Sequence, residues 1–278
     1  MTGALVRLCR PYYSVPMALA YALTLYYARG GQMVGAWAGF GYSTAALALV
    51  IAAAYVLNDV LDLAIDRVNA AGRPIPCGRI SRRAAAVWSG VLLAGGLALS
   101  AGARPAFAAA LALVAAALLV YDLASKRLGV GKQLLVAALM TSMYPLALAQ
   151  AGGAAGSRVP SLAVFAAWMF LTAFGYEVLK DLRDIRGDRA AAARTFDVHR
   201  RPAVWRRAAD ACLLAAALGL VLPLGLGCRW VYMAVAAVAM AAAVASVFVP
   251  VRRAIHLVYA ECFLVGVAAA ADAVIFGF

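Results

Sequence analysis

The sequence predicts an all-α protein that crosses a membrane several times. Of its 278 residues, 66% are hydrophobic and only 13% are charged, and long apolar runs recur along the whole chain. A soluble domain has about 25% charged residues. Because these features run from one end to the other, we expect a polytopic membrane protein.

Nine apolar runs are candidates for membrane-spanning helices, which need about 20 residues each. The first run is short, and the residues before it carry Arg7 and Arg10 but no small-residue cleavage site, which favours a retained span over a signal peptide. Glycine and proline separate the runs, for example at Gly30 and Pro250. The runs cover approximately residues 14–28, 36–58, 84–101, 105–122, 133–151, 160–179, 208–227, 230–250 and 256–277.

The basic residues are divided unequally between the two sides of this nine-span arrangement. Of the 25 Lys and Arg residues, 21 fall on the side of the N-terminus, and only Arg29, Arg104, Arg158 and Arg229 fall on the other. The positive-inside rule then places the N-terminus and the basic loops in the cytoplasm and the C-terminus outside the cell membrane. The net charge of +13 is explained by this rule, so we do not expect a nucleic-acid partner.

The five cysteines show no CxxC spacing, and the two histidines have no ligand-like spacing. We expect free thiols and neither a zinc nor a haem site.

Two clusters of acidic residues stand out at the ends of the second and sixth runs, on the predicted cytoplasmic side. Each has the spacing i, i+3, i+7, which on a helix places all three carboxylates in one narrow stripe. Like charges so placed repel one another at the edge of an apolar phase, so a cation is expected to hold them. The clusters are Asp59, Asp62 and Asp66, with Asn58 one turn before Asp62, and Asp181, Asp184 and Asp188.

Oxygen-only ligands of this kind favour Mg²⁺, which is commonly held by one or two carboxylates together with substrate phosphates. A single triplet could also be a solvated helix end that balances nearby arginines. Two matched triplets on one side of the membrane favour a metal and a diphosphate between them.

Basic residues are interleaved with the acids. Topology alone accounts for most of them, but Arg67 and Lys180 are also candidates for binding a diphosphate. Arg73 and Lys126 are stronger candidates for phosphate binding, because each lies close to a cluster or to the end of a span.

These motifs resemble those of the UbiA superfamily of membrane prenyltransferases. The first match is Asn58-Asp59-x-x-Asp62-x-x-x-Asp66, followed by Arg73-Pro74-Ile75-Pro76-x-Gly78. The second is Lys180-Asp181-x-x-Asp184-x-x-Gly187-Asp188, and Tyr121 to Arg127 also fits the family. The resemblance covers essentially the whole chain and implies one domain, residues 1–278, of nine helices around a central cavity.

The resemblance also implies an activity, in which Mg²⁺ and the motifs bind a prenyl diphosphate and an acceptor attacks the allylic carbon. By position in the family motifs, the resemblance implies that the metal ligands are Asn58, Asp62, Asp184 and Asp188. It implies that the supporting groups or further ligands are Asp59, Asp66 and Asp181. Lys126, Arg73 and Tyr121 are implied to bind or orient the diphosphate. The sequence departs from the family at Gly131-Lys132-Gln133-Leu134, where Gly-Asn-Leu is frequent, and in the loop around Thr195.

The loop after the first motif is most similar to the branch that makes archaeal-type ether lipids. This similarity implies a geranylgeranyl or longer donor and a lipophilic acceptor of the geranylgeranylglyceryl phosphate type. An aromatic acceptor of quinone or pigment synthesis is the alternative. Two remoter alternatives are a transporter, which needs no matched acid triplets, and a CDP-alcohol phosphotransferase, which has one compact aspartate motif.

Overall fold

The computed structural model describes residues 2–124, 128–190, 198 and 200–278, with the side chains of all of these except 186–190. Within these ranges every regular element is a helix. The helices are α1 (Thr2–Leu8), α2 (Pro11–Ala28), α3 (Trp37–Leu61), α4 (Leu63–Asn69), α5 (Arg82–Ser100), α6 (Pro105–Ala124), α7 (Gly131–Thr141), α8 (Met143–Ala151), α9 (Val159–Ala190), α10 (Pro202–Gly219), the 3₁₀ helix η3 (Leu222–Leu226), α11 (Trp230–Val247) and α12 (Val251–Phe276).

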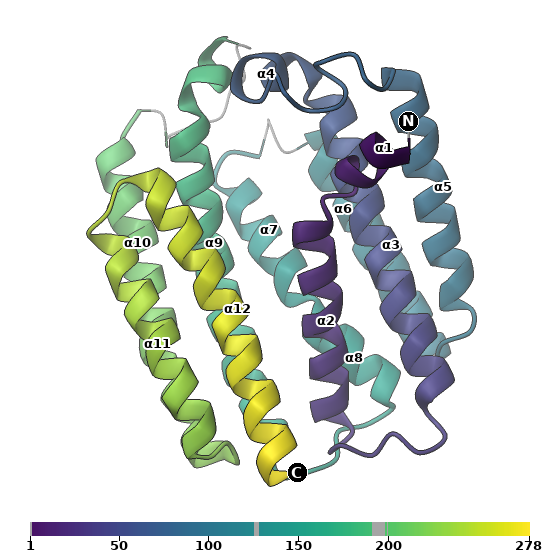
Figure 1. Ribbon diagram of the computed structural model, residues 1–278, viewed down its shortest axis with the longest axis vertical. Helices are drawn as coiled ribbons and strands as arrows, with labels where there is room; N and C mark the ends of the chain where they lie inside the picture. Colours follow the sequence, from purple (N-terminus) through teal and green to yellow (C-terminus); the bar gives the residue numbers. More distant parts are fainter. Residues whose placement is uncertain (1, 125–127, 191–197, 199) are drawn as a thin grey trace.

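The long helices run side by side in one bundle, with the two termini at opposite ends (Figure 1). In the described part of the chain, eight segments are long and apolar enough to cross a membrane, with α7 and α8 counted as one and α10 and η3 as another. The tyrosine-rich helix α2 is a further long helix of the bundle and packs on α3 and α8. The all-helical membrane fold expected from the sequence is therefore confirmed.

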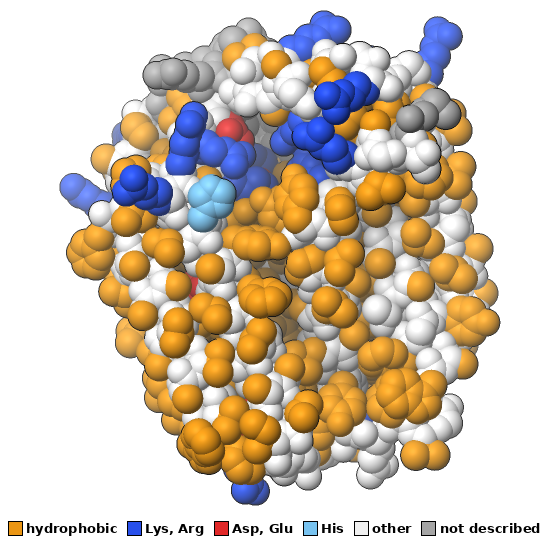
Figure 2. Space-filling view, viewed as in Figure 1, with side chains coloured by type: hydrophobic (Ala, Val, Ile, Leu, Met, Phe, Trp, Pro, Cys, Tyr) orange, Lys and Arg blue, Asp and Glu red, His pale blue; other side chains and the backbone are white. Residues whose placement is uncertain are grey.

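The outer surface of the bundle is apolar over most of its height (Figure 2). Large aliphatic side chains on this surface are mostly exposed, for example Leu113 (73%), Leu218 (71%) and Val274 (80%). A continuous apolar exterior of this kind is stable only when lipid covers it.

Two segments differ from the expected spans. The run 133–151 is broken between α7 and α8 at Ser142. Pro145 lacks the N–H that would bond to the carbonyl of Thr141, and the Ser142 hydroxyl donates to the carbonyl of Leu139 at 2.6 Å. The sixth span does not end at residue 179 but continues as α9 to Ala190 and so carries the second acidic motif.

Small residues let neighbouring helices approach closely. A Cβ atom on Gly96 of α5 would lie 2.9 Å from the carbonyl oxygen of Ala46 on α3, whereas one on Gly95 would meet only Leu49, at 3.7 Å. On α9, a Cβ atom on Gly175 would lie 3.0 Å from Leu213 of α10. Of the adjacent glycines Gly95 and Gly96, it is Gly96 that allows α5 to pack closely on α3.

Candidate active site

The first acidic motif lies where α3 ends, and it does not form a single helical stripe. Helix α3 ends at Leu61 and α4 begins at Leu63, with Asp62 at φ −91° and ψ 12° between them. Helix α4 turns across the end of the bundle (Figure 1). The continuous stripe expected from the i, i+3, i+7 spacing is therefore wrong for Asp66, which lies on α4 beyond the bend.

Asp59 and Asp66 are buried and paired with arginines. Arg10, between α1 and α2, donates to Asp59. Arg73 Nη1 lies 2.6 Å from both carboxylate oxygens of Asp66 and 3.3 Å from Asp59 Oδ1, so one guanidinium bridges α3 and α4. Burial raises the pKa of the Asp66 carboxyl, and the Arg73 guanidinium opposes that shift.

Asn58 and Asp62 form the more accessible half of this motif. Asn58 Nδ2 donates to Asp62 Oδ2 at 3.2 Å. Asp122, at the end of α6, interacts electrostatically with Asp62 and Asn58. Its Oδ2 atom is buried and has no hydrogen-bond partner among the described residues. Asn58, Asp62 and Asp122 thus bring three oxygen-bearing side chains together from two helices.

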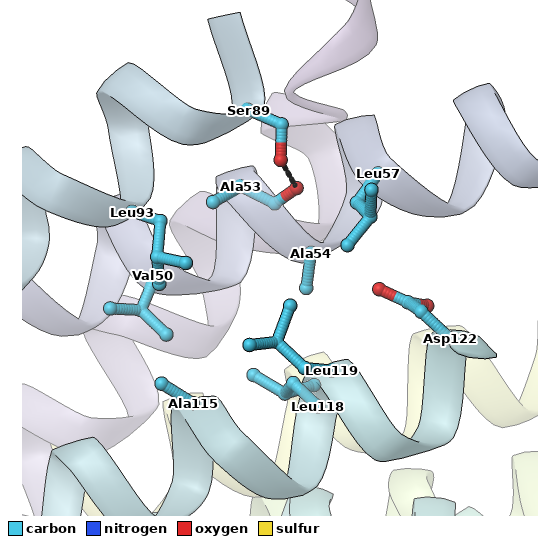
Figure 3. A pocket seen from close by; sticks show the side chains of 10 residues that line it. All are labelled: Val50, Ala53, Ala54, Leu57, Ser89, Leu93, Ala115, Leu118, Leu119 and Asp122. Carbon is cyan, nitrogen blue, oxygen red and sulfur yellow. Dashed lines mark hydrogen bonds between the residues drawn. The ribbon is translucent and has the colours of Figure 1, made fainter. Parts of the chain in front are cut away.

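Figure 3 shows how Asp122 reaches this position. A small pocket between α3, α5 and α6 is lined almost entirely by aliphatic side chains, including Leu57, Ala54 and Leu119, and Asp122 lies at one edge of it. The hydroxyl of Ser89 on α5 donates to the carbonyl of Ala53 at 2.8 Å and fixes α5 against α3. The aliphatic lining holds the end of α6, and therefore Asp122, next to the first motif.

The second motif lies near the end of α9, and its first aspartate is also paired with a cation. Asp181 is 5% exposed. Lys132 Nζ lies 2.5 Å from Asp181 Oδ1, and Gln133 Nε2 donates to Asp181 Oδ2 at 2.7 Å. Glu177, one turn earlier on α9, accepts from Lys180 at 2.6 Å and lies 3.3 Å from Lys132.

The structure brings the two motifs to the same end of the bundle. Asn69, the last residue of α4, donates from Nδ2 to the carbonyl oxygen of Asp184 on α9 at 3.2 Å. The hydroxyl of Tyr121 on α6 donates to Glu177 on α9 at 3.5 Å. The Asp184 carboxylate accepts two hydrogen bonds from Arg183, each 2.7 Å long. The described parts of both motifs therefore face one region at the α4 end of the molecule.

A group of tyrosines lies one turn or so deeper in the bundle than the acidic residues. The rings of Tyr13 and Tyr55 stack with their centroids 5.7 Å apart, and the Tyr13 and Tyr176 hydroxyls are 2.8 Å apart. Arg10 lies 5.1 Å from the centre of the Tyr55 ring, and Tyr13 also meets Tyr259 of α12 edge to face. These rings join α2, α3, α9 and α12 directly beneath the charged groups.

Figure 2 shows this end of the molecule from outside. Lys and Arg side chains gather around the α4 end, and the surface below them is hollowed between the regions that α12 and α2 occupy in Figure 1. Charged groups therefore border a recess whose walls are apolar.

The residues present suit a Mg²⁺ ion whose ligands come partly from the protein and partly from the substrate. In the described ranges, no three His, Cys, Asp or Glu side chains are grouped closely enough to hold a metal ion by themselves. Asn58, Asp62 and Asp122 each offer oxygen atoms as metal ligands, and one oxygen of Asp122 is buried without a partner in the part of the chain that the structure describes. Such a donor set suits Mg²⁺ that completes its shell with water and phosphate oxygens.

Comparison with known proteins identifies the family. The model of the UbiA prenyltransferase family matches residues 15–260. The chain belongs to this family.

Two curated UbiA relatives carry the name digeranylgeranylglyceryl phosphate synthase. The protein from Halobacterium salinarum is 39% identical over 70% of this chain and 68% of its own length. The protein from Methanoregula boonei is 38% identical over 68% of this chain, and the match spans 65% of that relative's length, slightly less than two thirds.

Solved UbiA structures share the fold. A UbiA homologue from Aeropyrum pernix K1 has a TM-score of 0.75 with 22% identity and covers 93% of this chain and 96% of its own. A UbiA homologue from Archaeoglobus fulgidus, solved with GPP and Mg²⁺, has a TM-score of 0.72 with 16% identity and covers 97% and 99%. The membrane fold expected from the UbiA resemblance is confirmed.

Several residues of the UbiA motifs remain predictions. Lys126 lies outside the described residues, as does the side chain of Asp188. Arg67 is on the exposed side of α4. The other three candidates lie at the α4 end of the bundle and contact acidic residues. Arg73 contacts Asp66, and both Lys180 and Tyr121 contact Glu177.

Residues outside the predicted UbiA site proved to be its neighbours. Asp59 is contacted by Arg10, and Asp181 is contacted by Lys132 and Gln133. Glu177 contacts Lys132. Lys132 could have been noticed in the sequence, because it stands where the family frequently has the asparagine of Gly-Asn-Leu.

Proposed function

We propose that this protein is a Mg²⁺-dependent intramembrane prenyltransferase, which moves a polyprenyl group from a prenyl diphosphate to a lipophilic acceptor. The observation that carries the proposal is the meeting of two acidic motifs at one end of an apolar bundle, linked by Asn69 and Asp184. The name of the curated relatives and the GPP and Mg²⁺ bound to the Archaeoglobus fulgidus homologue support it.

The charged residues provide a binding site for the donor's diphosphate. Asn58, Asp62, Asp184 and Asp188 would hold Mg²⁺, with Asp122 as a further oxygen donor. When bound, the metal would neutralise negative charge that develops on the diphosphate as it leaves. Arginine and lysine N–H groups then bind diphosphate oxygens that the metal does not reach.

The bundle separates this charged end from the reacting carbon and the tail. The bond between the allylic carbon and the diphosphate oxygen breaks, and the diphosphate keeps the electron pair. An acceptor oxygen forms the new bond to that carbon and loses its proton. The rings of Tyr13, Tyr55 and Tyr176 lie one turn below the motifs, where their faces can stabilise positive charge and exclude water.

The acceptor that we propose is a lipid of the geranylgeranylglyceryl phosphate type, with a geranylgeranyl or longer donor. The names of the relatives favour it. The apolar walls of the recess suit an acceptor that enters from the membrane.

We also propose that the active-site end and the N-terminus face the cytoplasm, with the C-terminus outside the cell membrane. The gathering of Lys and Arg side chains around the α4 end supports this orientation.

The class of reaction is tested by the product released from purified protein in detergent. With Mg²⁺, geranylgeranyl diphosphate and a glyceryl phosphate lipid, we expect release of inorganic diphosphate that stops when EDTA removes the metal. A phosphotransferase, offered a CDP-alcohol in a parallel mixture, would instead release CMP from it, and a transporter would release neither product. Either of those results would refute prenyl transfer.

A further inference from the structure

Lys132 is placed unusually for a lysine at the start of a membrane-spanning segment. Its side chain is only 14% exposed, and its ammonium lies 2.5 Å from Asp181 and 3.3 Å from Glu177 on the facing helix α9. Gln133 donates to the other oxygen of Asp181 at 2.7 Å. Both oxygens of Asp181 therefore already have donors from the protein.

The charges of this cluster balance. Glu177 and Asp181 supply two negative charges, and Lys132 and Lys180 supply two positive charges, with Lys180 bound to Glu177 at 2.6 Å. Without Lys132 the cluster would carry one uncompensated negative charge, one turn away from Asp184. A buried negative charge of this kind attracts a cation.

The ammonium of Lys132 has three N–H groups. Asp181 and Glu177 provide acceptors for two of them. A diphosphate oxygen is a suitable acceptor for the third, since a lysine binds phosphate as a compact point charge.

The first motif is built in the same way. Asp59 is buried and held by Arg10 and Arg73, while Asp62, three residues later, is more accessible. In each motif the first aspartate is thus buried and paired with a cation of the protein, and the second is closer to the surface, where Asp184 pairs with Arg183. The repetition indicates that the pairing of Asp181 is part of how the site is built.

We propose that Lys132 is the fixed cation of the second motif, where it takes the place that a metal ion would have beside Asp181 and binds the diphosphate of the donor. Asp181 is then a positioning residue that holds Lys132, and it is not a metal ligand. The proposal rests on the proposed function for the identity of the donor. It narrows the metal ligands of the second motif to Asp184 and Asp188.

Binding of Mn²⁺ alone to the full-length protein, measured by electron paramagnetic resonance without substrate, tests the first half of the proposal. Lys132→Met frees the Asp181 carboxylate, so this variant should bind Mn²⁺ about tenfold more tightly or gain a site, on the scale of one charged contact. Adding Asp181→Asn to Lys132→Met should return Mn²⁺ binding to the native level. Arg83→Met, at an exposed arginine of α5, is the control and should bind as the native protein does.

Mn²⁺ binding by Lys132→Met that equals the native level would overturn the proposal, as would a gain that survives Asp181→Asn. If Lys132→Met does not fold, Lys132→Gln replaces it, because glutamine keeps a hydrogen-bond donor for Asp181 but removes the charge.

The second half is tested by binding of inorganic diphosphate in EDTA. The native protein and Lys132→Arg should bind it, and Lys132→Met should bind about tenfold more weakly. Equal affinity of native protein and Lys132→Met would contradict a contact between Lys132 and the diphosphate. Neither experiment involves turnover, so a failure of the native protein to transfer a prenyl group would refute the proposed function alone.

Discussion

Two aspartates three residues apart at the end of α3 have different surroundings. Asp59 is 2% exposed and is held by two arginines, whereas Asp62 is half-buried and accepts a hydrogen bond from Asn58. A carboxylate whose charge is already balanced inside the protein supports the site, and one near the surface can bind a metal together with substrate. We therefore propose Asp62 as a metal ligand, and likewise Asp184, whose partner Arg183 lies with it at the surface.

Replacing Asp62 or Asp184 by alanine should reduce prenyl transfer by about 100-fold or more, because the charge that develops on the diphosphate loses its stabilisation. Each variant should still insert into membranes, since neither residue is in the core. Asp210→Asn, on α10 where Asp210 pairs with Arg206, is the matched control and should keep its activity. Initial rates measured at saturating Mg²⁺ check this, and full activity of either alanine variant would contradict the assignment.

Helix α2 is the element on which the topology depends. It has 18 residues, and at about 1.5 Å per residue it is close to the thickness of a bilayer core. Its Tyr-rich composition makes it less apolar than the other long helices, but it lies within the bundle beside α3 and α8 (Figure 1). Counting α2 as a crossing makes the number of crossings odd, which agrees with termini at opposite ends of the molecule.

A reporter fused after Phe278 should therefore give a signal from outside the cytoplasm, and one fused to the N-terminus, before α2, should give a cytoplasmic signal. Paired reporters that are active on only one side of the membrane make this measurement. If the fusions at the N-terminus and after Phe278 report from the same side, the number of crossings is even and α2 does not span the membrane.

On the scale of the whole molecule, charge and hydrophobicity are separated along the bundle. The acidic motifs and their arginine and lysine partners lie at the α4 end, and apolar side chains cover most of the face below them that Figure 2 shows. A prenyl diphosphate has the same division, with a charged head and an apolar tail. The arrangement suits both parts of the proposed donor.

Much of this arrangement follows from local sequence. Apolar runs predict the helices, and matched spacings predict that Asp62 and Asp184 belong to related motifs. The bend at Asp62 was not predictable, because no proline or glycine marks it and Arg73 draws Asp66 toward Asp59 from outside the helix. The contact of Lys132 with Asp181 crosses 49 residues, and periodicity carries no information on such contacts.

The identity of the transferred group and its acceptor is the most direct test of this account. Purified protein with Mg²⁺ and geranylgeranyl diphosphate is offered geranylgeranylglyceryl phosphate and a panel of aromatic acids, and the products are identified by mass. We expect geranylgeranylglyceryl phosphate to gain one geranylgeranyl group. A prenylated aromatic acid would contradict the proposed acceptor, and the absence of any prenylated product would contradict prenyl transfer itself.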